Sequence, residues 1–267
     1  MTADERPKVF ENRFPEGVAA PGAPVRVQDP CTCFHQGREN HSGGKVGFHP
    51  EVQDTSAPGW LRLLELIDEA VADGREEFRP LPQMRPEERR QLVTLPAEIA
   101  RLTAVKSLVV YGSNLVRIPP EIGAMSSLEE FVPYTSGRLH WFPYEITRCP
   151  RLVRSTVSTR AIYGNFKFRA PFPRLQPPRD SVTGADLARL DPARWGSTAI
   201  STCSVCDEPL AGRGLHQAWI SLVVATDVLP LLVNACSADC LHRLPSGAGN
   251  HLPTAHQGGP VEQPPPR

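Results

Sequence analysis

A short sequence unit recurs through the middle of this 267-residue chain and limits what the chain can fold into. Residues 95–99 read LPAEI, and the pattern returns as IPPEI at residues 118–122 and more loosely as FPYEI at residues 142–146. A unit repeated about every 23 residues predicts a solenoid, in which each unit buries its apolar side against its neighbours. The repeats therefore predict a stack of similar units in the centre of the chain.

Apolar residues between the repeated motifs indicate one short strand per unit. The predicted strands cover residues 105–110, 128–133 and 152–157. Serine follows the first two strands at Ser113 and Ser136, where its hydroxyl can bond adjacent backbones, whereas Arg160 follows the third. We expect the repeats and a C-terminal cap to occupy residues 92–180, with the third unit degenerate or part of the cap.

A helix is predicted before the repeats, within a cap at residues 57–91. Its apolar residues recur at helical spacing, and it has a proline near its start and Gly74 as its stop signal. This amphipathic helix would cover the apolar end of the first repeat. The residues predicted for its apolar face are Trp60, Leu63, Leu64, Ile67 and Val71.

Both ends of the chain are rich in Pro, Gly and polar residues. We predict an irregular arm at residues 1–56 and a disordered tail at residues 246–267. The N-terminus leads into no apolar signal segment, and no run approaches the roughly 18 apolar residues of a membrane span. Twenty-nine basic and 29 acidic residues give zero formal charge, which argues against a surface that binds nucleic acid or membrane over its entire extent. We expect a cytoplasmic protein with no membrane partner.

Four cysteines in two close pairs predict a metal site in a module at residues 195–245. Cys203 and Cys206 form a CxxC pair, Cys236 and Cys240 form a CxxxC pair, and 29 residues separate the two pairs. Four thiolates can surround one zinc ion tetrahedrally and leave no position for a substrate, so we expect one structural zinc per chain. Unliganded thiols or a redox pair are the alternatives. The β-rich segment between the pairs predicts a hairpin, and a nearby histidine, His216 or His242, is expected to be a bystander.

A second cysteine cluster lies in the N-terminal arm. Cys31, Cys33 and His35 lie close together in sequence, with His41 and His49 beyond them. Such a group can bind metal, but it lacks a second pair at ligand spacing, so a solvent-exposed arm is the other interpretation. Only a metal-dependent enzyme would need this second site.

A stretch without acidic residues carries several basic side chains from residue 148 to 179. Basic groups neutralise phosphates and aromatic faces stack on bases, so this strip could bind nucleic acid. The other interpretation is solvated arginines beside aromatic residues that cap the last repeat. The candidate nucleic-acid contacts are Arg148, Arg151, Arg154, Arg160, Lys167 and Arg169.

The repeated LPxxI units resemble those of small intracellular leucine-rich repeat proteins, and the cysteine module is similar to zinc ribbons and treble clefs. The resemblance implies an α/β fold: a short leucine-rich repeat solenoid capped by the N-terminal amphipathic helix, plus a small β-rich zinc-binding module. It also implies a protein-binding face along the strands. The candidate surface positions are Tyr111, Ser113, Tyr134, Ser136, Thr156 and Ser158.

No nucleophile elbow and no HExxH motif occur in the chain, which favours a non-enzymatic function. The sequence therefore predicts a protein–protein interaction scaffold with a structural zinc and an unidentified protein partner. Its alternatives are a nucleic-acid-associated protein that uses the basic strip, and a metal-dependent enzyme with a second site near Cys31 and Cys33.

Overall fold

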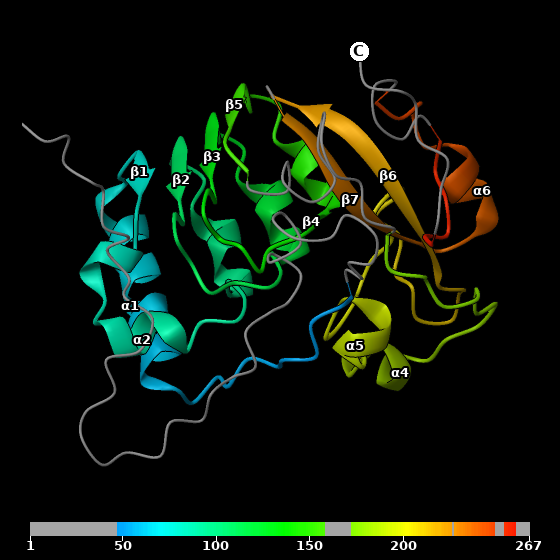
Figure 1. The fold of residues 1–267 in the computed structure, drawn as a ribbon, viewed down its shortest axis with the longest axis horizontal. Helices are drawn as coiled ribbons and strands as arrows, with labels where there is room; N and C mark the ends of the chain where they lie inside the picture. Colours follow the sequence, from blue (N-terminus) through cyan, green and yellow to red (C-terminus); the bar gives the residue numbers. More distant parts are fainter. Residues whose placement is uncertain (1–46, 158–171, 226, 249–253, 260–267) are drawn as a thin grey trace, which may run out of the picture. The chain divides into compact units, whose positions relative to one another are not determined.

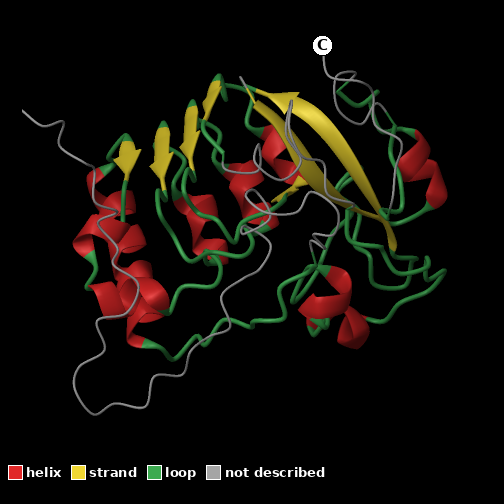
Figure 2. Ribbon diagram, viewed as in Figure 1, coloured by secondary structure: helices red, strands yellow, loops and turns green. Residues whose placement is uncertain are grey.

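The computed structural model describes residues 47–157, 172–225, 227–248 and 254–259, which form two β-sheets and a set of short helices (Figures 1 and 2). One sheet has the strand order β1-β2-β3-β5 and the other has the order β4-β7-β6. The strands are β1 (Glu77–Phe78), β2 (Ser107–Val109), β3 (Glu130–Val132), β4 (Phe142–Pro143), β5 (Arg154–Ser155), β6 (His216–Val224) and β7 (Asp227–Ala235). The α-helices are α1 (Pro58–Asp73), α2 (Pro86–Arg90), α4 (Gly184–Ala188), α5 (Pro192–Trp195) and α6 (Ala238–His242), and the 3-10 helices are η2 (Leu81–Gln83), η3 (Ala97–Arg101), η4 (Pro120–Ala124) and η5 (Tyr144–Arg148).

The four-stranded sheet is entirely parallel, and its strands stand side by side in Figure 1. Leu108 of β2 is paired with Phe78 on one side and with Phe131 on the other, and all three side chains are fully buried. Each LPxxI motif ends in a 3-10 helix, because its proline holds extended backbone at the helix N-cap while the following isoleucine enters the core. The repeated motif thus specifies one 3-10 turn per unit.

The predicted fold class, a short leucine-rich repeat solenoid with a helical cap and a small zinc module, is wrong. The structure is a mixed α/β arrangement with one parallel and one mixed sheet. Phe142–Pro143, which sequence placed in the third repeat, forms β4 and pairs in parallel with Leu231 and Leu232 of β7. The physical reason is that this segment buries its apolar side against the long β6–β7 hairpin, and one core cluster runs from α1 to α6.

Helix α1 begins with Pro58 and ends at Gly74, whose φ of 63° is a left-handed conformation that glycine adopts at low cost. Its buried face consists of Gly59, Leu63, Leu66, Ile67 and Ala70, whereas Val71 is exposed, so the face is rotated from the predicted one. A Cβ at Gly59 would clash with the Glu88 carbonyl oxygen, so the absence of a side chain at Gly59 lets α1 lie this close to α2. No helix in the described part of the chain is long and apolar enough to cross a membrane.

Residues 47–53 form an extended strap that contacts three successive units of the four-stranded sheet. The Gln53 side chain accepts the backbone N–H of Val93 in the first unit. Arg117 in the second unit donates to the carbonyl oxygens of Glu51 and His49 at 2.6 and 2.7 Å. The next unit contributes His140, whose ring centroid lies 5.1 Å from that of His49. The strap thus ties the units together across their loops.

At its start the strap also reaches the second sheet. The Phe48 ring lies 4.9 Å from Trp141 and 5.8 Å from Trp219 of β6, measured between ring centroids. Glu51 further forms an ion pair with Arg138. The strap therefore contacts residues of both sheets.

The C-terminal residues 254–259 add to the edge of β6, although they lie in the stretch predicted as a disordered tail. His256 forms a β-bridge with Trp219, and Gly259 forms one with Phe172. Nδ1 of His256 accepts the backbone N–H of Gly258, and its Nε2 is buried without a hydrogen-bond partner. Burial lowers the pKa of His256 from 6.5 to about 4.

This lowered pKa predicts a loss of stability in mild acid. Above pH 6.5 the imidazole is neutral in both states, whereas between 6.5 and about 4 the unfolded chain binds a proton that the folded chain does not. Stability should therefore fall as pH decreases through this window, by roughly 1–3 kcal/mol, a range that allows for the partial exposure of the ring. Urea unfolding of the wild type and His256→Gln at several pH values measures it. Identical pH profiles for the two proteins would contradict the assignment.

Candidate metal centre

The first pair of cysteines lies in a tight turn before β6, residues 203–208, here named the cysteine turn. Cys203 donates its backbone N–H to the Glu208 carbonyl at 2.9 Å, and its own carbonyl accepts from Asp207 at 3.1 Å. Asp207 has a φ of 63°, which reverses the chain within the turn. The turn brings the side chains of Cys203 and Cys206 to the same side, as the CxxC spacing predicts.

The second pair is positioned by the β6–β7 hairpin. Cys236 follows β7 directly, and Cys240 lies in the first turn of α6. Ser237 caps α6, because its hydroxyl accepts the Cys240 backbone N–H at 3.2 Å. The hairpin returns the chain to the cysteine turn, so pairs that are 29 residues apart in sequence meet in space.

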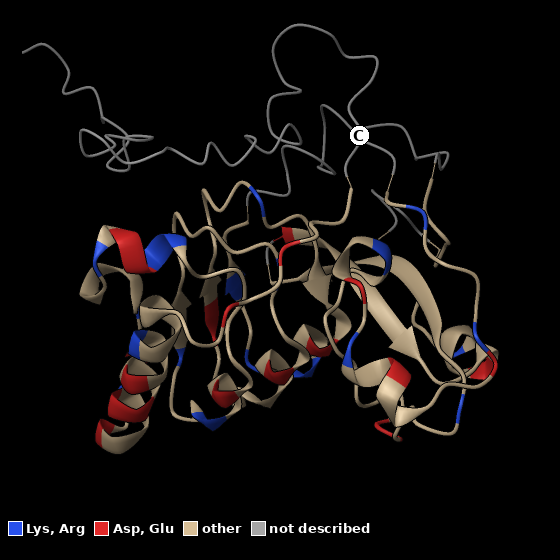
Figure 3. Ribbon diagram, turned by 90° about the horizontal axis from the view of Figure 1, so that it is seen from below, with Lys and Arg blue, Asp and Glu red and all other residues tan. Residues whose placement is uncertain are grey.

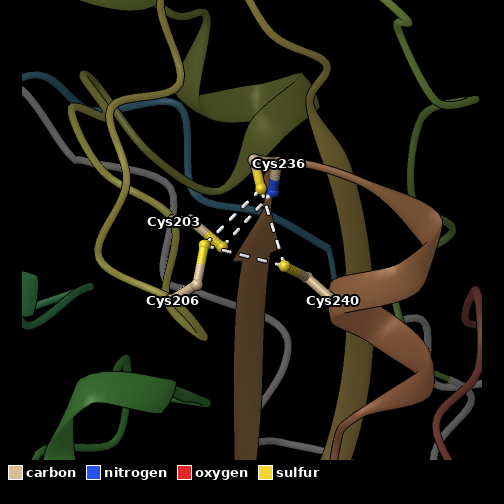
Figure 4. Close-up of side chains that lie close together, drawn as sticks. All are labelled: Cys203, Cys206, Cys236 and Cys240. Carbon is tan, nitrogen blue, oxygen red and sulfur yellow. Dashed lines mark hydrogen bonds between the residues drawn. The ribbon is translucent and has the colours of Figure 1, made fainter.

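The four thiols, here called the cysteine cluster, have their sulfur atoms within 4.8 Å of one another (Figure 4). Sγ of Cys206 lies 3.6 Å from Cys236 and 3.7 Å from Cys240, and the last two sulfurs are 3.5 Å apart. Four sulfurs around one zinc ion at ~2.3 Å are separated by about 3.8 Å in a regular tetrahedron. The cluster therefore fits a tetrahedral metal ion with only small movements of the side chains. Within the described residues it is the one group of three or more His, Cys, Asp or Glu side chains placed to hold a metal ion.

The cluster is largely closed to solvent. Cys203 is fully buried, Cys240 is 2% exposed and Cys236 is 7% exposed, whereas Cys206 is partly exposed. Two backbone N–H groups, from Val205 and Cys236, each donate to Sγ of Cys203 at 3.4 Å. Such bonds stabilise a thiolate, the form that binds metal.

The thiols differ in how easily they ionise. Burial raises the pKa of Cys203, and burial together with the Cys240 and Cys206 thiols raises the pKa of Cys236 to about 12. Burial also opposes ionisation of Cys240, but hydrogen bonds from Ser237, Cys236 and Arg243 together lower its pKa to about 7. The Arg243 guanidinium donates to Sγ of Cys240 at 2.8 Å. A cation here offsets the negative charge that four thiolates around a divalent ion would carry.

The cysteine turn also contacts η5 of the repeat region, which sequence did not predict. Arg148 forms an ion pair with Asp207 at 2.6 Å and donates to the Ser204 carbonyl at 2.7 Å. Glu145 of η5 is buried, and burial raises its pKa while a hydrogen bond from Ser204 opposes the shift. Little in the sequence indicates that Glu145 is buried, because it occupies the same motif position as Glu98, which is exposed.

The predicted protein-binding residues divide into exposed and buried sets. Tyr111 and Tyr134 are 45% and 46% exposed, and their ring centroids are 6.0 Å apart beyond the ends of β2 and β3. Thr156 is also exposed. Ser158 lies outside the described residues.

Ser113 and Ser136 are buried, so they do not offer surface to a partner. Their hydroxyls lie 2.7 Å apart, and the Ser136 hydroxyl bonds the backbone of the preceding unit twice, at the Ser113 N–H and the Val110 carbonyl. The two serine hydroxyls therefore link adjacent units through hydrogen bonds, as the sequence predicted.

The basic strip is only partly described, because Arg160, Lys167 and Arg169 lie outside the described residues. Arg148 pairs with Asp207, and Arg154 lies 3.5 Å from Glu130. Arg151 is exposed. Figure 3 marks the basic and acidic positions along the ribbon, and both colours occur throughout the described residues.

The remaining cysteines give no second site that the structure can place. Cys31, Cys33 and His35 lie outside the described residues. Cys149 is a buried core thiol that donates to the Ile122 carbonyl at 3.3 Å, and burial raises its pKa to about 11.

No family model matches the chain, and no curated protein matches it. One solved structure that it resembles is a leucine-rich repeat (LRR) protein of Leptospira interrogans, at 27% sequence identity and a TM-score of 0.23. The match covers 25% of this chain and 18% of that protein, so the chain spans less than a fifth of its length. A likeness of this extent leaves the function to be argued from the residues of the chain itself.

Proposed function

We propose that this chain is a non-enzymatic interaction protein, in which one structural zinc ion holds the cysteine cluster and the outward face of the four-stranded sheet binds a protein partner. The observation that carries the first part is the convergence of four sulfurs within 4.8 Å. Four thiolates complete the coordination of zinc and leave no open position for catalysis. The turn, hairpin and short helix that supply them resemble a treble clef.

Soft thiolates in a tetrahedral arrangement select zinc or iron, and a closed set of four cysteines is typical of structural zinc. Cysteine ligands must remain reduced, which agrees with the expectation of a cytoplasmic protein. Elemental analysis of the protein purified without added metal or a histidine tag tests this part. We expect one zinc per chain, and either a metal-free protein or one iron per chain would contradict it.

The second part rests on the two exposed tyrosines. Tyrosine is enriched at the centre of protein interfaces because its ring offers a large apolar area and its hydroxyl a polar group. Val109 ends β2 and Val132 ends β3, each two residues before one of the tyrosines. Both valines are half-buried on the same face of the sheet. This apolar surface supports a protein partner more than a nucleic acid, since Arg148 and Arg154 are already beside carboxylates.

Alanine replacements at Tyr111 and Tyr134 are expected to weaken partner binding at least tenfold, because interface tyrosines often contribute more than ~1.4 kcal/mol each. Quantitative affinity capture from native lysate compares the double variant with the wild type. Leu61→Ala, which truncates an exposed side chain of α1, is the matched control. Equal recovery of every captured protein by all three proteins would refute this binding face.

A further inference from the structure

We propose that the cysteine cluster is also an oxidation site, at which hydrogen peroxide first attacks Cys206 and the disulfide that follows expels the metal. This inference rests on the proposed structural metal, because it describes how that same site would be regulated. It adds a chemical modification and a class of reactant, a small peroxide, to a site whose role so far is structural.

Accessibility singles out Cys206 within the cluster. The other three sulfurs belong to residues that are 7% exposed or less, whereas Cys206 is partly exposed. Oxidation of cysteine follows thiolate character and solvent access, and metal binding keeps all four sulfurs as thiolates. Among sulfurs of equal charge, the exposed one reacts first.

Hydrogen bonds further separate Cys206 from Cys203. Sγ of Cys203 accepts two backbone N–H groups at 3.4 Å. A donor that occupies a sulfur lone pair makes that sulfur a weaker nucleophile toward peroxide. The Arg243 guanidinium interacts with both Cys240 and Cys206, so between these two sulfurs the difference is solvent access alone.

A partner thiol for the second step is already within reach. Sγ of Cys206 lies 3.6 Å from Cys236 and 3.7 Å from Cys240, both from the other cysteine pair. A disulfide bond measures ~2.05 Å, so the sulfurs need to approach by only about 1.6 Å. The disulfide would then join the cysteine turn to the segment after β7.

The reaction balances with peroxide as the oxidant. In the first step the O–O bond breaks, one oxygen binds Cys206 as a sulfenic acid, and the other leaves as hydroxide and takes up a proton to become water. In the second step a neighbouring thiolate attacks the Cys206 sulfur, the S–S bond forms, and the S–O bond breaks to release a second hydroxide, which is protonated to water. Two thiolates lose two electrons in total, and one peroxide with two protons becomes two waters. Two thiolates remain, too few to retain the metal.

The test follows metal and sulfur together in the wild-type protein, since replacing Cys206 would itself remove a ligand. Protein carrying its metal is treated with hydrogen peroxide, zinc release is read with a coloured chelator, and sulfenic acid is trapped with dimedone for peptide mass spectrometry. We expect one zinc released per chain, a first dimedone adduct on Cys206, and a disulfide from Cys206 to Cys236 or Cys240. The matched control Cys149→Ala removes a buried thiol outside the cluster and should release zinc at the same rate.

Two results would overturn the inference: a first adduct on another cluster cysteine, or zinc that stays bound while the protein is oxidised elsewhere. A protein that contains no metal before peroxide is added contradicts the proposed structural site instead. The two failures are therefore distinguishable.

Discussion

Replacing Cys203 and Cys206 with serine is expected to abolish metal binding and to lower the free energy of unfolding by at least ~4 kcal/mol. Structural zinc contributes on the order of 10 kcal/mol of binding free energy to small domains, and loss of a metal belongs to the largest class of single-site effects. In this chain the extensive core of the four-stranded sheet remains, so we expect the effect to concentrate around the cysteine turn and α6.

Elemental analysis for the metal, urea unfolding for the free energy and limited proteolysis for the location of the effect test this prediction together. The double variant should lose its zinc, and cleavage should become faster within residues 200–245 while residues 57–157 stay protected. Cys149→Ala is the control, because it removes a thiol that lies outside the cluster and should keep one zinc per chain. A double variant with wild-type stability and protease resistance would show that the cluster has no structural role.

Trp219→Ala is expected to destabilise the protein by about 3–5 kcal/mol, which is a large part of the 5–15 kcal/mol typical of a folded domain. Trp219 is fully buried in the middle of β6, with ring centroids of Phe48, Trp141 and Phe172 at 5.8, 5.9 and 5.3 Å. Its indole N–H donates to the Pro173 carbonyl at 2.8 Å, so truncation leaves a cavity and also an unpaired buried oxygen.

Urea unfolding followed by far-ultraviolet circular dichroism measures the loss without depending on tryptophan fluorescence. Trp60→Ala is the matched control, because Trp60 lies on α1 and is only partly buried, and we expect it to cost less. Trp219→Phe should be intermediate, since it keeps an aromatic ring but removes the N–H donor. A cost below about 1 kcal/mol for Trp219→Ala would contradict the central position of this side chain in the core.

Local patterns in the sequence were sufficient to predict the elements that depend on nearby residues. The LPxxI motif combines a proline that sets the backbone with an isoleucine that enters the core, and both effects act within five residues. The cysteine pairs were equally predictable, because each CxxC or CxxxC pair shares one turn and the intervening residues favour a hairpin that brings the pairs together.

Contacts between distant segments were not predictable in the same way. The pairing of Phe142 with Leu231 depends on which apolar edge the third unit meets, and a single motif does not encode that choice. Glu145 illustrates the limit, since its motif matches that of Glu98, yet Glu145 is buried and Glu98 is exposed. The predicted solenoid was wrong because periodicity describes each unit and its neighbour, and says nothing about a second sheet.

The strap at residues 47–53 has a consequence for the order in which the protein folds. Its partners lie far along the chain: Val93 is 40 residues from Gln53, Arg117 is 66 residues from Glu51, and Arg138 is 87 residues from Glu51. Each contact closes a long loop, and contacts that close long loops form more slowly than local ones. We expect the strap to dock last, after both sheets have met. In a newly synthesised chain, the strap leaves the ribosome before all these partners. It would nevertheless be among the last parts of the protein to pack into place.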